Sequence, residues 1–219
     1  MALDIKICGL KTDEALAAAL AGGASHVGFI FFQKSPRNVD PIEAGRLREI
    51  ARGRAKAVAV TVDADDQTLD HIVASMTPDM LQLHGHETVE RVAGVKASYG
   101  LPVMKAFAVR EAADIDAIAP YIGVADRFLF DAKPPVGSEL PGGNGVSFDW
   151  RLLAGLEGRV DYMLSGGLNA ANIGEALRLT NPPGIDISSG VESAPGVKDV
   201  ALIDGFFRAV RAATDNRAA

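Results

Sequence analysis

Residues 4–31 read DIKICGLKTDEALAAALAGGASHVGFIF, and the pattern in this stretch decides the fold. A short apolar run at residues 5–8 is followed by an Ala/Leu-rich segment at residues 12–21 and a second apolar run at residues 26–31. The two apolar runs predict β-strands, and the segment between them predicts a helix. Because several of the short β-rich runs along the chain are nearly continuously apolar, we expect the strands to lie in a parallel sheet that is covered on both faces.

The same alternation of short strands and longer helical segments continues along the chain. If eight strands share the 219 residues, about 27 residues are available for each unit, which suits a βα repeat. The alternation is compatible with a closed barrel or an open doubly wound sheet, but an open sheet of eight strands would be large for this length. We therefore predict an α/β fold with a single (β/α)8 TIM barrel over residues 1–213 and a flexible tail at residues 214–219. The other expected strands lie at residues 57–62, 80–83, 103–106, 127–131, 162–165 and 184–187, and the other helices at residues 41–52, 69–76, 88–99, 170–179 and 201–213.

The composition argues against several classes of partner. The chain is 48% hydrophobic and 23% charged, and its net charge of −6 disfavours binding to nucleic-acid phosphates or anionic lipid. No apolar run approaches the ~18 residues that span a bilayer, and the N-terminus lacks the pattern of a signal peptide. The single cysteine, Cys8, cannot form an intramolecular disulfide. We therefore expect a cytoplasmic protein with no nucleic-acid or membrane partner.

A barrel places its active site at the carboxyl ends of its strands, so the residues at the end of the first strand are candidate site residues. Side chains alternate along a strand, which points Lys6 and Cys8 into the barrel while Ile5 and Ile7 face the helices. Cys8 is then either a small buried hydrophobe or a reactive thiol. Lys6 either favours the thiolate form of Cys8 or forms a core ion pair with an inward carboxylate.

Asp131 ends the strand at residues 127–131, on the face opposite to Phe128 and Phe130. A carboxyl group that projects into a barrel mouth and is kept protonated by burial is a candidate general acid. The alternative, a helix N-cap, is weakened because residues 132–145 are rich in proline and glycine and do not resemble a helix start. This segment, with its proline-rich part at residues 133–141, is a candidate mobile lid.

Polar side chains also follow the second and fourth strands. Arg37 lies in the loop after the second strand, where a guanidinium can clamp a carboxylate or phosphate with two parallel hydrogen bonds, or can be solvated. Gln82 and His84 share the inward face of the fourth strand, and we expect them to orient other groups through hydrogen bonds. His84 and His86 have no third or fourth ligand in register, so we predict no metal ion. The chain also shows no cofactor motif.

Glycine-rich turns follow the last three strands and predict a phosphate site. Backbone N–H groups approach an anion where no side chain intervenes, and barrels of this kind often bind phosphate after strands seven and eight. A short helix after strand eight would add its positive N-terminal end. We therefore expect a small phosphorylated substrate, held by residues from the set Gly142, Gly143, Gly166, Gly167, Ser189 and Gly190.

In this order along the chain, these residues resemble the phosphoribosylanthranilate isomerase family. The resemblance covers nearly the whole chain, and its specificity comes from all the motifs together. They are Lys6-Ile7-Cys8-Gly9, Gly28-Phe29-Ile30-Phe31 with Ser35-Pro36-Arg37, Leu81-Gln82-Leu83-His84-Gly85, Gly142-Gly143-Asn144-Gly145 with Phe148-Asp149-Trp150, Ser165-Gly166-Gly167-Leu168, Asp186-Ile187-Ser188-Ser189-Gly190-Val191-Glu192 and Pro195-Gly196-Val197-Lys198-Asp199.

The resemblance implies an Amadori rearrangement in tryptophan biosynthesis, in which N-(5′-phosphoribosyl)anthranilate becomes 1-(o-carboxyphenylamino)-1-deoxyribulose 5-phosphate without a cofactor. It implies that Cys8 is the general base and Asp131 the general acid. It further implies that Arg37 faces the anthranilate carboxylate, that Asp186 lies near the ribose hydroxyls, and that Gly143, Gly167 and the Ser189-Gly190 turn hold the phosphate.

Two alternatives remain open at this point. Indoleglycerol-phosphate synthase, another phosphate-binding barrel, is expected to need a catalytic lysine and glutamate at strand ends, and Lys105 is the one feature that favours it. A non-catalytic phosphosugar-binding barrel would keep the glycines but need neither Cys8 nor Asp131. The pattern does not distinguish a monomer from a homodimer.

Overall fold

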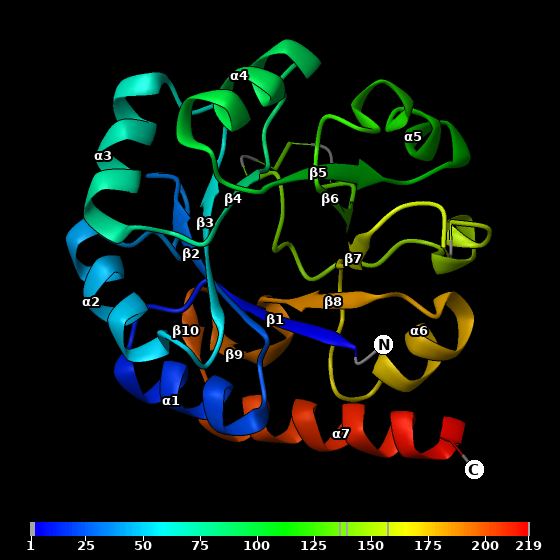
Figure 1. Ribbon diagram of the computed structural model, residues 1–219. Helices are drawn as coiled ribbons and strands as arrows, with labels where there is room; N and C mark the ends of the chain where they lie inside the picture. The colour runs from blue at the N-terminus through cyan, green and yellow to red at the C-terminus, as the bar shows by residue number, and fades with distance from the viewer. Residues whose placement is uncertain (1–2, 136, 139, 157, 219) are drawn as a thin grey trace.

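The computed structural model describes residues 3–135, 137–138, 140–156 and 158–218. Eight parallel strands form a closed barrel in the order β1 to β8, and β1 pairs with β8 to complete the ring (Figure 1). The prediction of a closed barrel is therefore confirmed. The strands are β1 (Asp4–Cys8), β2 (His26–Phe31), β3 (Lys56–Thr61), β4 (Met80–Leu83), β5 (Val103–Val109), β6 (Arg127–Ala132), β7 (Tyr162–Leu164) and β8 (Gly184–Ile187).

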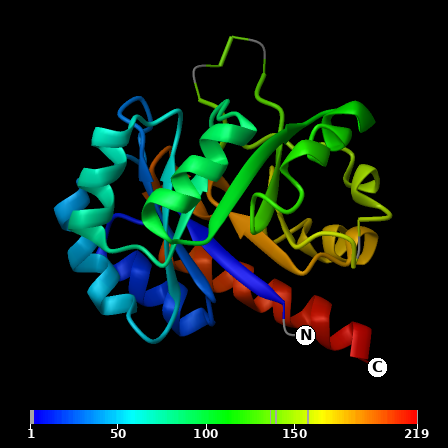
Figure 2. The same ribbon diagram turned by 45° about the horizontal axis from the view of Figure 1, so that its top comes forward.

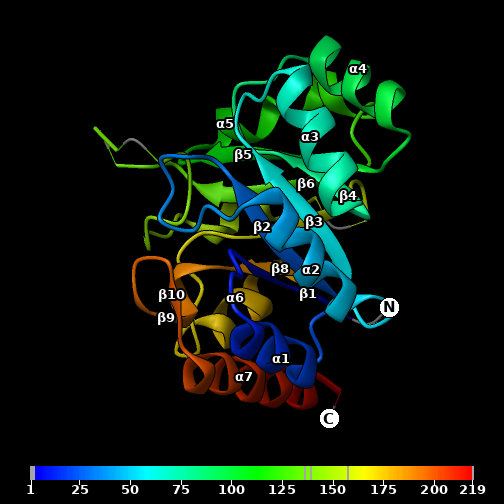
Figure 3. The ribbon, with the colours of Figure 1, turned by 90° about the vertical axis from the view of Figure 1, so that its left-hand side faces the viewer.

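Helices surround the barrel on its outer side (Figure 2). The last helix packs against both the first helix and the one before it, so the helical ring closes where the strand ring closes (Figure 3). The helices are α1 (Asp13–Gly22), α2 (Pro41–Ala51), α3 (Asp66–Met76), α4 (Val89–Tyr99), α5 (Ala112–Asp116), α6 (Ile173–Thr180) and α7 (Val200–Ala218), with 3-10 turns η1 (Ala119–Tyr121), η2 (Trp150–Leu153) and η3 (Ser189–Val191). A small antiparallel pair, β9 (Glu192–Ala194) and β10 (Val197–Lys198), follows η3.

The helices begin where short polar side chains cap them. Thr12 and Thr88 accept hydrogen bonds from backbone N–H groups in the first turns of α1 and α4, and Asp40 and Asp65 do the same for α2 and α3. Gly23 ends α1 in the left-handed region at φ 101°, a conformation that glycine adopts without a steric penalty.

Several boundaries differ from the prediction. The Asn169 side chain accepts hydrogen bonds from the N–H groups of Ala171 and Asn172, but this turn precedes α6, which begins only at Ile173. The last helix continues to Ala218, beyond the expected end at residue 213, so residues 214–218 of the segment predicted as a tail extend α7 and residue 219 lies outside the described residues. Between β6 and β7, the described residues contain η2 and no α-helix. Of the segment predicted as a lid, residues 136 and 139 lie outside the described residues.

Alternation along the strands separates two apolar layers. Side chains such as Val58, Met104, Leu129 and Met163 fill the barrel interior together with Cys8. The intervening strand residues pack against the helices, and they include Ile7, Leu81, Phe128, Phe130, Ile185 and Ile187. Cys8, Gln82, Asp131 and Asp186 therefore share the inward face of their strands, as the period of two predicts. No helix among the described residues is both long and apolar enough to cross a membrane.

Candidate active site

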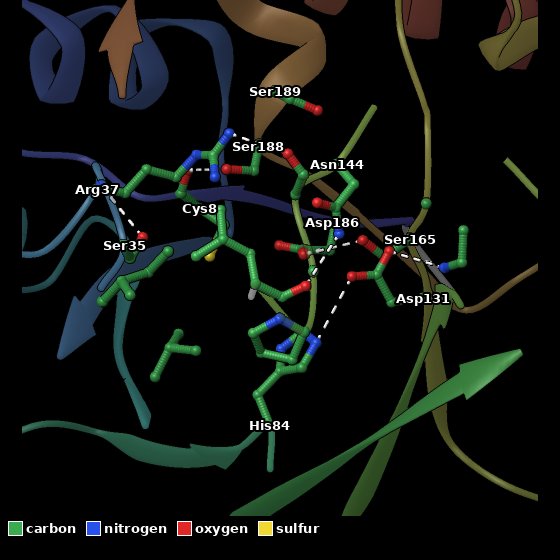
Figure 4. Close-up of a pocket in the computed structure, with 18 of the residues that line it drawn as sticks. Cys8, Ser35, Arg37, His84, Asp131, Asn144, Ser165, Asp186, Ser188 and Ser189 are labelled. Carbon is green, nitrogen blue, oxygen red and sulfur yellow. Dashed lines mark hydrogen bonds and ion pairs between the residues drawn. The ribbon is translucent and has the colours of Figure 1, made fainter. Parts of the chain in front are cut away.

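A pocket opens at the carboxyl ends of the strands and contains most of the predicted site residues (Figure 4). Cys8 reaches it from β1, Asp131 from β6 and Asp186 from β8, while Gln82 and His84 come from β4 and the residue after it. Loops after the strands supply the rest of its wall. The lining includes Cys8, Arg37, Gln82, His84, Asp131, Gly142, Gly143, Gly166, Gly167, Asp186, Ser188 and Ser189.

Cys8 is 5% exposed and stands opposite Gly28 of β2. A Cβ atom at position 28 would lie 2.9 Å from the Cys8 sulfur, so glycine is needed there to make room for the thiol. Burial raises the pKa of the Cys8 thiol, and the charge of Lys6 opposes this effect. The thiol is therefore a poor acid unless a positive charge compensates for its loss of water.

Lys6 and Asp186 form a fully buried ion pair between β1 and β8, with 2.8 Å between Nζ and Oδ1. The second carboxylate oxygen of Asp186 accepts a hydrogen bond from the Ser165 hydroxyl at 3.2 Å. Burial alone would lower the pKa of Lys6, but the nearby Asp186 and Cys8 raise it, so the lysine is charged. The expected core ion pair of Lys6 is thus present, and its partner is Asp186.

Asp131 and His84 lie next to each other in the pocket, with 3.5 Å between Oδ2 and Nε2 (Figure 4). The amide of Gln82 donates to Nδ1 of His84 at 3.0 Å, which leaves Nε2 as the protonated ring nitrogen that points toward Asp131. Oδ1 of Asp131 accepts from the backbone N–H of Ala132 at 2.9 Å. The contacts run from Gln82 through His84 toward Asp131, and a role of these two side chains in orienting Asp131 stays a prediction.

Arg37 is 4% exposed, and its guanidinium is already engaged on one edge. Nε and Nη2 donate to the two carboxylate oxygens of Glu192, and Nη2 also donates to the carbonyl of Gly143 at 3.1 Å. Burial raises the pKa of Glu192, but the contacts with Arg37 and Lys198 lower it by more. The net pKa is therefore lowered, and the carboxylate is charged. The alternative of a solvated loop arginine is wrong, and Nη1, which lies close to Gly143, donates to none of the described residues.

Four of the five glycines expected to bind phosphate line the pocket. Gly143, Gly166 and Gly167 all have positive φ, from 66° to 87°, which favours glycine. A Cβ atom at Gly167 would lie 2.7 Å from the carbonyl oxygen of Val146, so a side chain there would displace the loop. Ser189 lines the pocket beside them, whereas Gly190 packs against Leu168 and is not among the lining residues. The element after β8 is only the three-residue turn η3, so the expected helix dipole is small.

Glu192 and Lys198 were not among the site residues predicted from the sequence. Glu192 bridges Arg37 and Lys198, and the Lys198 ammonium donates to Glu192 Oε1 at 2.6 Å and to the Ser188 carbonyl at 2.9 Å. Burial lowers the pKa of Lys198 despite the Glu192 charge. Both residues belong to the motifs after β8 that carry the family resemblance, which was the one signal that pointed to them.

Lys105, the feature that favoured a synthase, faces away from the barrel interior. Its neighbours Met104 and Ala106 point inward, and Lys105 pairs with Glu87 on the outer side at 3.0 Å. It therefore lies outside the pocket that contains Cys8 and Asp131. His86 is largely exposed and contacts Asp63, and no three His, Cys, Asp or Glu side chains of the described residues are grouped to hold a metal ion.

Comparisons with known proteins agree on one family. The model of the family described as N-(5′-phosphoribosyl)anthranilate (PRA) isomerase matches residues 5–209. The N-(5′-phosphoribosyl)anthranilate isomerase of Mesorhizobium japonicum is 80% identical over 219 residues, which is all of both chains, and that of Brucella canis is 72% identical over 96% of this chain and 95% of its own.

Solved structures give the same result. The phosphoribosyl anthranilate isomerase of Thermotoga maritima superposes with a TM-score of 0.85 at 31% identity and covers 96% of this chain and 100% of its own. A phosphoribosyl anthranilate isomerase in complex with reduced 1-(o-carboxyphenylamino)-1-deoxyribulose 5-phosphate has a TM-score of 0.82 at 29% identity, over 96% of this chain and 100% of its own.

Proposed function

This chain belongs to the N-(5′-phosphoribosyl)anthranilate isomerase family and is an isomerase of tryptophan biosynthesis, and from that premise we propose that Cys8 and Asp131 perform its acid–base chemistry. The observation that carries the proposal is that a thiol from β1 and a carboxyl group from β6 line one pocket. The reaction moves protons and makes no net change in composition, so one base and one acid meet its chemical demand.

The first step uses Asp131 as the acid. Its proton passes to the furanose ring oxygen of the substrate, the bond between C1 and that oxygen breaks, and the ring opens to an iminium ion. Nε2–H of His84 lies 3.5 Å from Oδ2 of Asp131, where it can stabilise the carboxylate that this proton transfer leaves. The Gln82 amide fixes the tautomer that places this N–H toward Asp131.

The second step uses Cys8 as the base. The iminium ion acidifies the proton on C2, and the thiolate removes it to give an enolamine, which tautomerises to the ketose. The proton gained by Cys8 balances the one lost by Asp131, so the active site supplies no net proton to the isomer. A free thiol has a pKa of about 8.5, and burial in this pocket raises it, so the thiolate needs a nearby cation.

Substrate binding divides between two sides of the pocket. The backbone N–H groups around Gly143, Gly167 and Ser189 suit a phosphate, with Gly166 shaping the turn and Gly190 holding it against Leu168. Nη1 of Arg37 suits the anthranilate carboxylate, and Asp186 suits the ribose hydroxyls. Support comes from the solved relative that holds a reduced analogue of the product. A cytoplasmic location stays a prediction, and none is made between a monomer and a homodimer.

The test is an assay of the purified chain with phosphoribosylanthranilate, followed by the loss of substrate fluorescence. We expect turnover without added metal or cofactor. No loss of phosphoribosylanthranilate, with an indole product formed when the aminoketose is supplied in its place, would favour the synthase, and binding without turnover of either compound would favour a phosphosugar-binding barrel. Either of these results would contradict the proposed chemistry.

A further inference from the structure

The buried lysines of the barrel differ in how many acceptors they have. An ammonium group has three N–H donors. Lys105 donates to the carbonyls of Leu83, Gly85 and Ala106, at 2.9 to 3.3 Å, and also pairs with Glu87. Lys198 has Glu192 and both oxygens of Ser188. Lys6 has a single oxygen acceptor among the described residues, Oδ1 of Asp186, although it is completely buried.

The end of the Lys6 side chain lies near the Cys8 sulfur. The two residues share the inward face of β1. A Cβ atom built on Gly28 would lie 2.9 Å from Cys8 Sγ and 3.1 Å from Cε of Lys6, so both atoms border one small space and are at most about 6 Å apart. Gly28 leaves this space free, and a larger residue would occupy it. A thiolate there would be an anionic acceptor for the donors that Asp186 does not use.

We propose that Lys6 is the positioning residue that stabilises the Cys8 thiolate, and that Asp186 both holds the ammonium group in place and limits its effect through its own negative charge. This inference rests on the proposed role of Cys8 as the base. Lys6 itself transfers no proton, because its ion pair with Asp186 keeps it charged.

The charged groups around Cys8 shift the pKa of its thiol in opposite directions. Burial raises the pKa of the thiol, Lys6 lowers it, Asp186 raises it again, and Lys198 lowers it from the β10 side. Asp131 and His84 face the same pocket from β6 and β4. Removing Lys6 and removing Asp186 should therefore shift the titration of Cys8 in opposite directions, whereas a purely structural ion pair would respond to both losses in the same direction.

The experiment measures the rate of alkylation of Cys8 by iodoacetamide as a function of pH, without substrate. Cys8 is the only cysteine of the chain, so mass spectrometry and thiolate absorbance report on this one group. The pH at the inflection of this rate curve reports the pKa of the Cys8 thiol. For Lys6→Met we expect this inflection to move up by about one pH unit or more, which is roughly a tenfold slower reaction at neutral pH. Lys6→Arg should largely restore the wild-type inflection, and Asp186→Asn, which keeps an acceptor for Lys6, should lower it.

Lys198→Met is the matched control, because it removes a second buried cation whose donors are saturated by Ser188 and Glu192. Its shift should be smaller than that of Lys6→Met. Circular dichroism and thermal unfolding establish that each variant is folded. If Lys6→Met does not fold, Asp186→Asn still provides the test, since a lower inflection supports the proposal and an unchanged or higher one overturns it.

The proposal is overturned if Lys6→Met titrates like the wild type, or if Lys6→Met and Asp186→Asn shift the inflection in the same direction. These outcomes do not depend on turnover. If Cys8→Ser kept normal turnover while the alkylation shifts appeared as expected, the role of Cys8 as the base would fail and the control of its thiolate by Lys6 would stand.

Discussion

Glu192 accepts a hydrogen bond from Arg37 at each carboxylate oxygen, at 2.8 Å, although the two residues are 155 positions apart in the sequence. The same carboxylate accepts from Lys198, so one buried anion fixes two cations, of which Arg37 lines the pocket. A guanidinium held in this way is already oriented before substrate arrives, which reduces the entropy that binding must otherwise overcome. Arg37 is thus a preorganised cation with Nη1 left to meet an anionic group.

Arg37→Met should weaken the binding of phosphoribosylanthranilate more than it slows turnover. A charged hydrogen bond to a carboxylate contributes roughly 1.5–3 kcal/mol, which corresponds to an increase in KM of about 10- to 150-fold. Steady-state kinetics measure this, with Arg151→Met as the control because Arg151 forms only an exposed pair with Asp149. A wild-type KM for Arg37→Met would mean that another group meets the anthranilate carboxylate.

The contacts of Arg37 also illustrate what the sequence reveals and what it does not. Alternation along a strand is local, so the inward positions of Cys8, Gln82 and Asp131 follow from their immediate neighbours. The pairing of Arg37 with Glu192 depends instead on how two loops meet after the barrel has closed, and no local pattern encodes it. Lys105 favoured the synthase in the sequence, but its neighbours Met104 and Ala106 are the residues that point into the barrel. Lys105 lies between them and therefore faces the helices.

The ends of the strands and helices also differ in how well the sequence predicts them. The strands at residues 26–31, 80–83 and 184–187 were predicted with their observed ends, because turn-forming residues flank them closely. The start of α6 was predicted too early because Asn169 caps a turn in the way that it would cap a helix.

Gly167→Ala should raise the KM for the phosphorylated substrate with a smaller effect on kcat. A methyl group there would press on the Val146 carbonyl and displace the backbone donors that face the pocket. Gly155→Ala is a matched control, since Gly155 also has positive φ, at 91°, but has open space around it. Both variants carry the strain of a left-handed alanine, so an equal KM in the two would place the phosphate elsewhere.

His26 should make the fold sensitive to mild acid. Burial is the main reason that its pKa falls to about 4, with Asp4 raising it and Arg127 lowering it further. The folded protein therefore keeps His26 neutral where the unfolded chain, with a pKa of about 6.5, takes up a proton. Stability from this group is present above about pH 6.5 and is lost as the pH falls toward 4, by about 2 kcal/mol between pH 7 and pH 5.

Urea unfolding of the wild type and of His26→Gln at these two pH values measures the effect. The free energy of unfolding of His26→Gln should fall less between them, while His86→Gln should behave like the wild type because His86 is exposed to solvent. If His26→Gln and the wild type lost the same free energy, another group would cause the acid sensitivity.

The most direct test of the central claim is the kcat of Cys8→Ser and Asp131→Asn on phosphoribosylanthranilate. Each change is nearly isosteric, so the fold should persist, while a serine hydroxyl is a far weaker base and an amide cannot protonate the ring oxygen. We predict that each variant loses about 10²- to 10⁴-fold in kcat and keeps a KM close to that of the wild type. A near-normal kcat for Cys8→Ser would contradict the account and turn attention to Asp186 or His84 as the base.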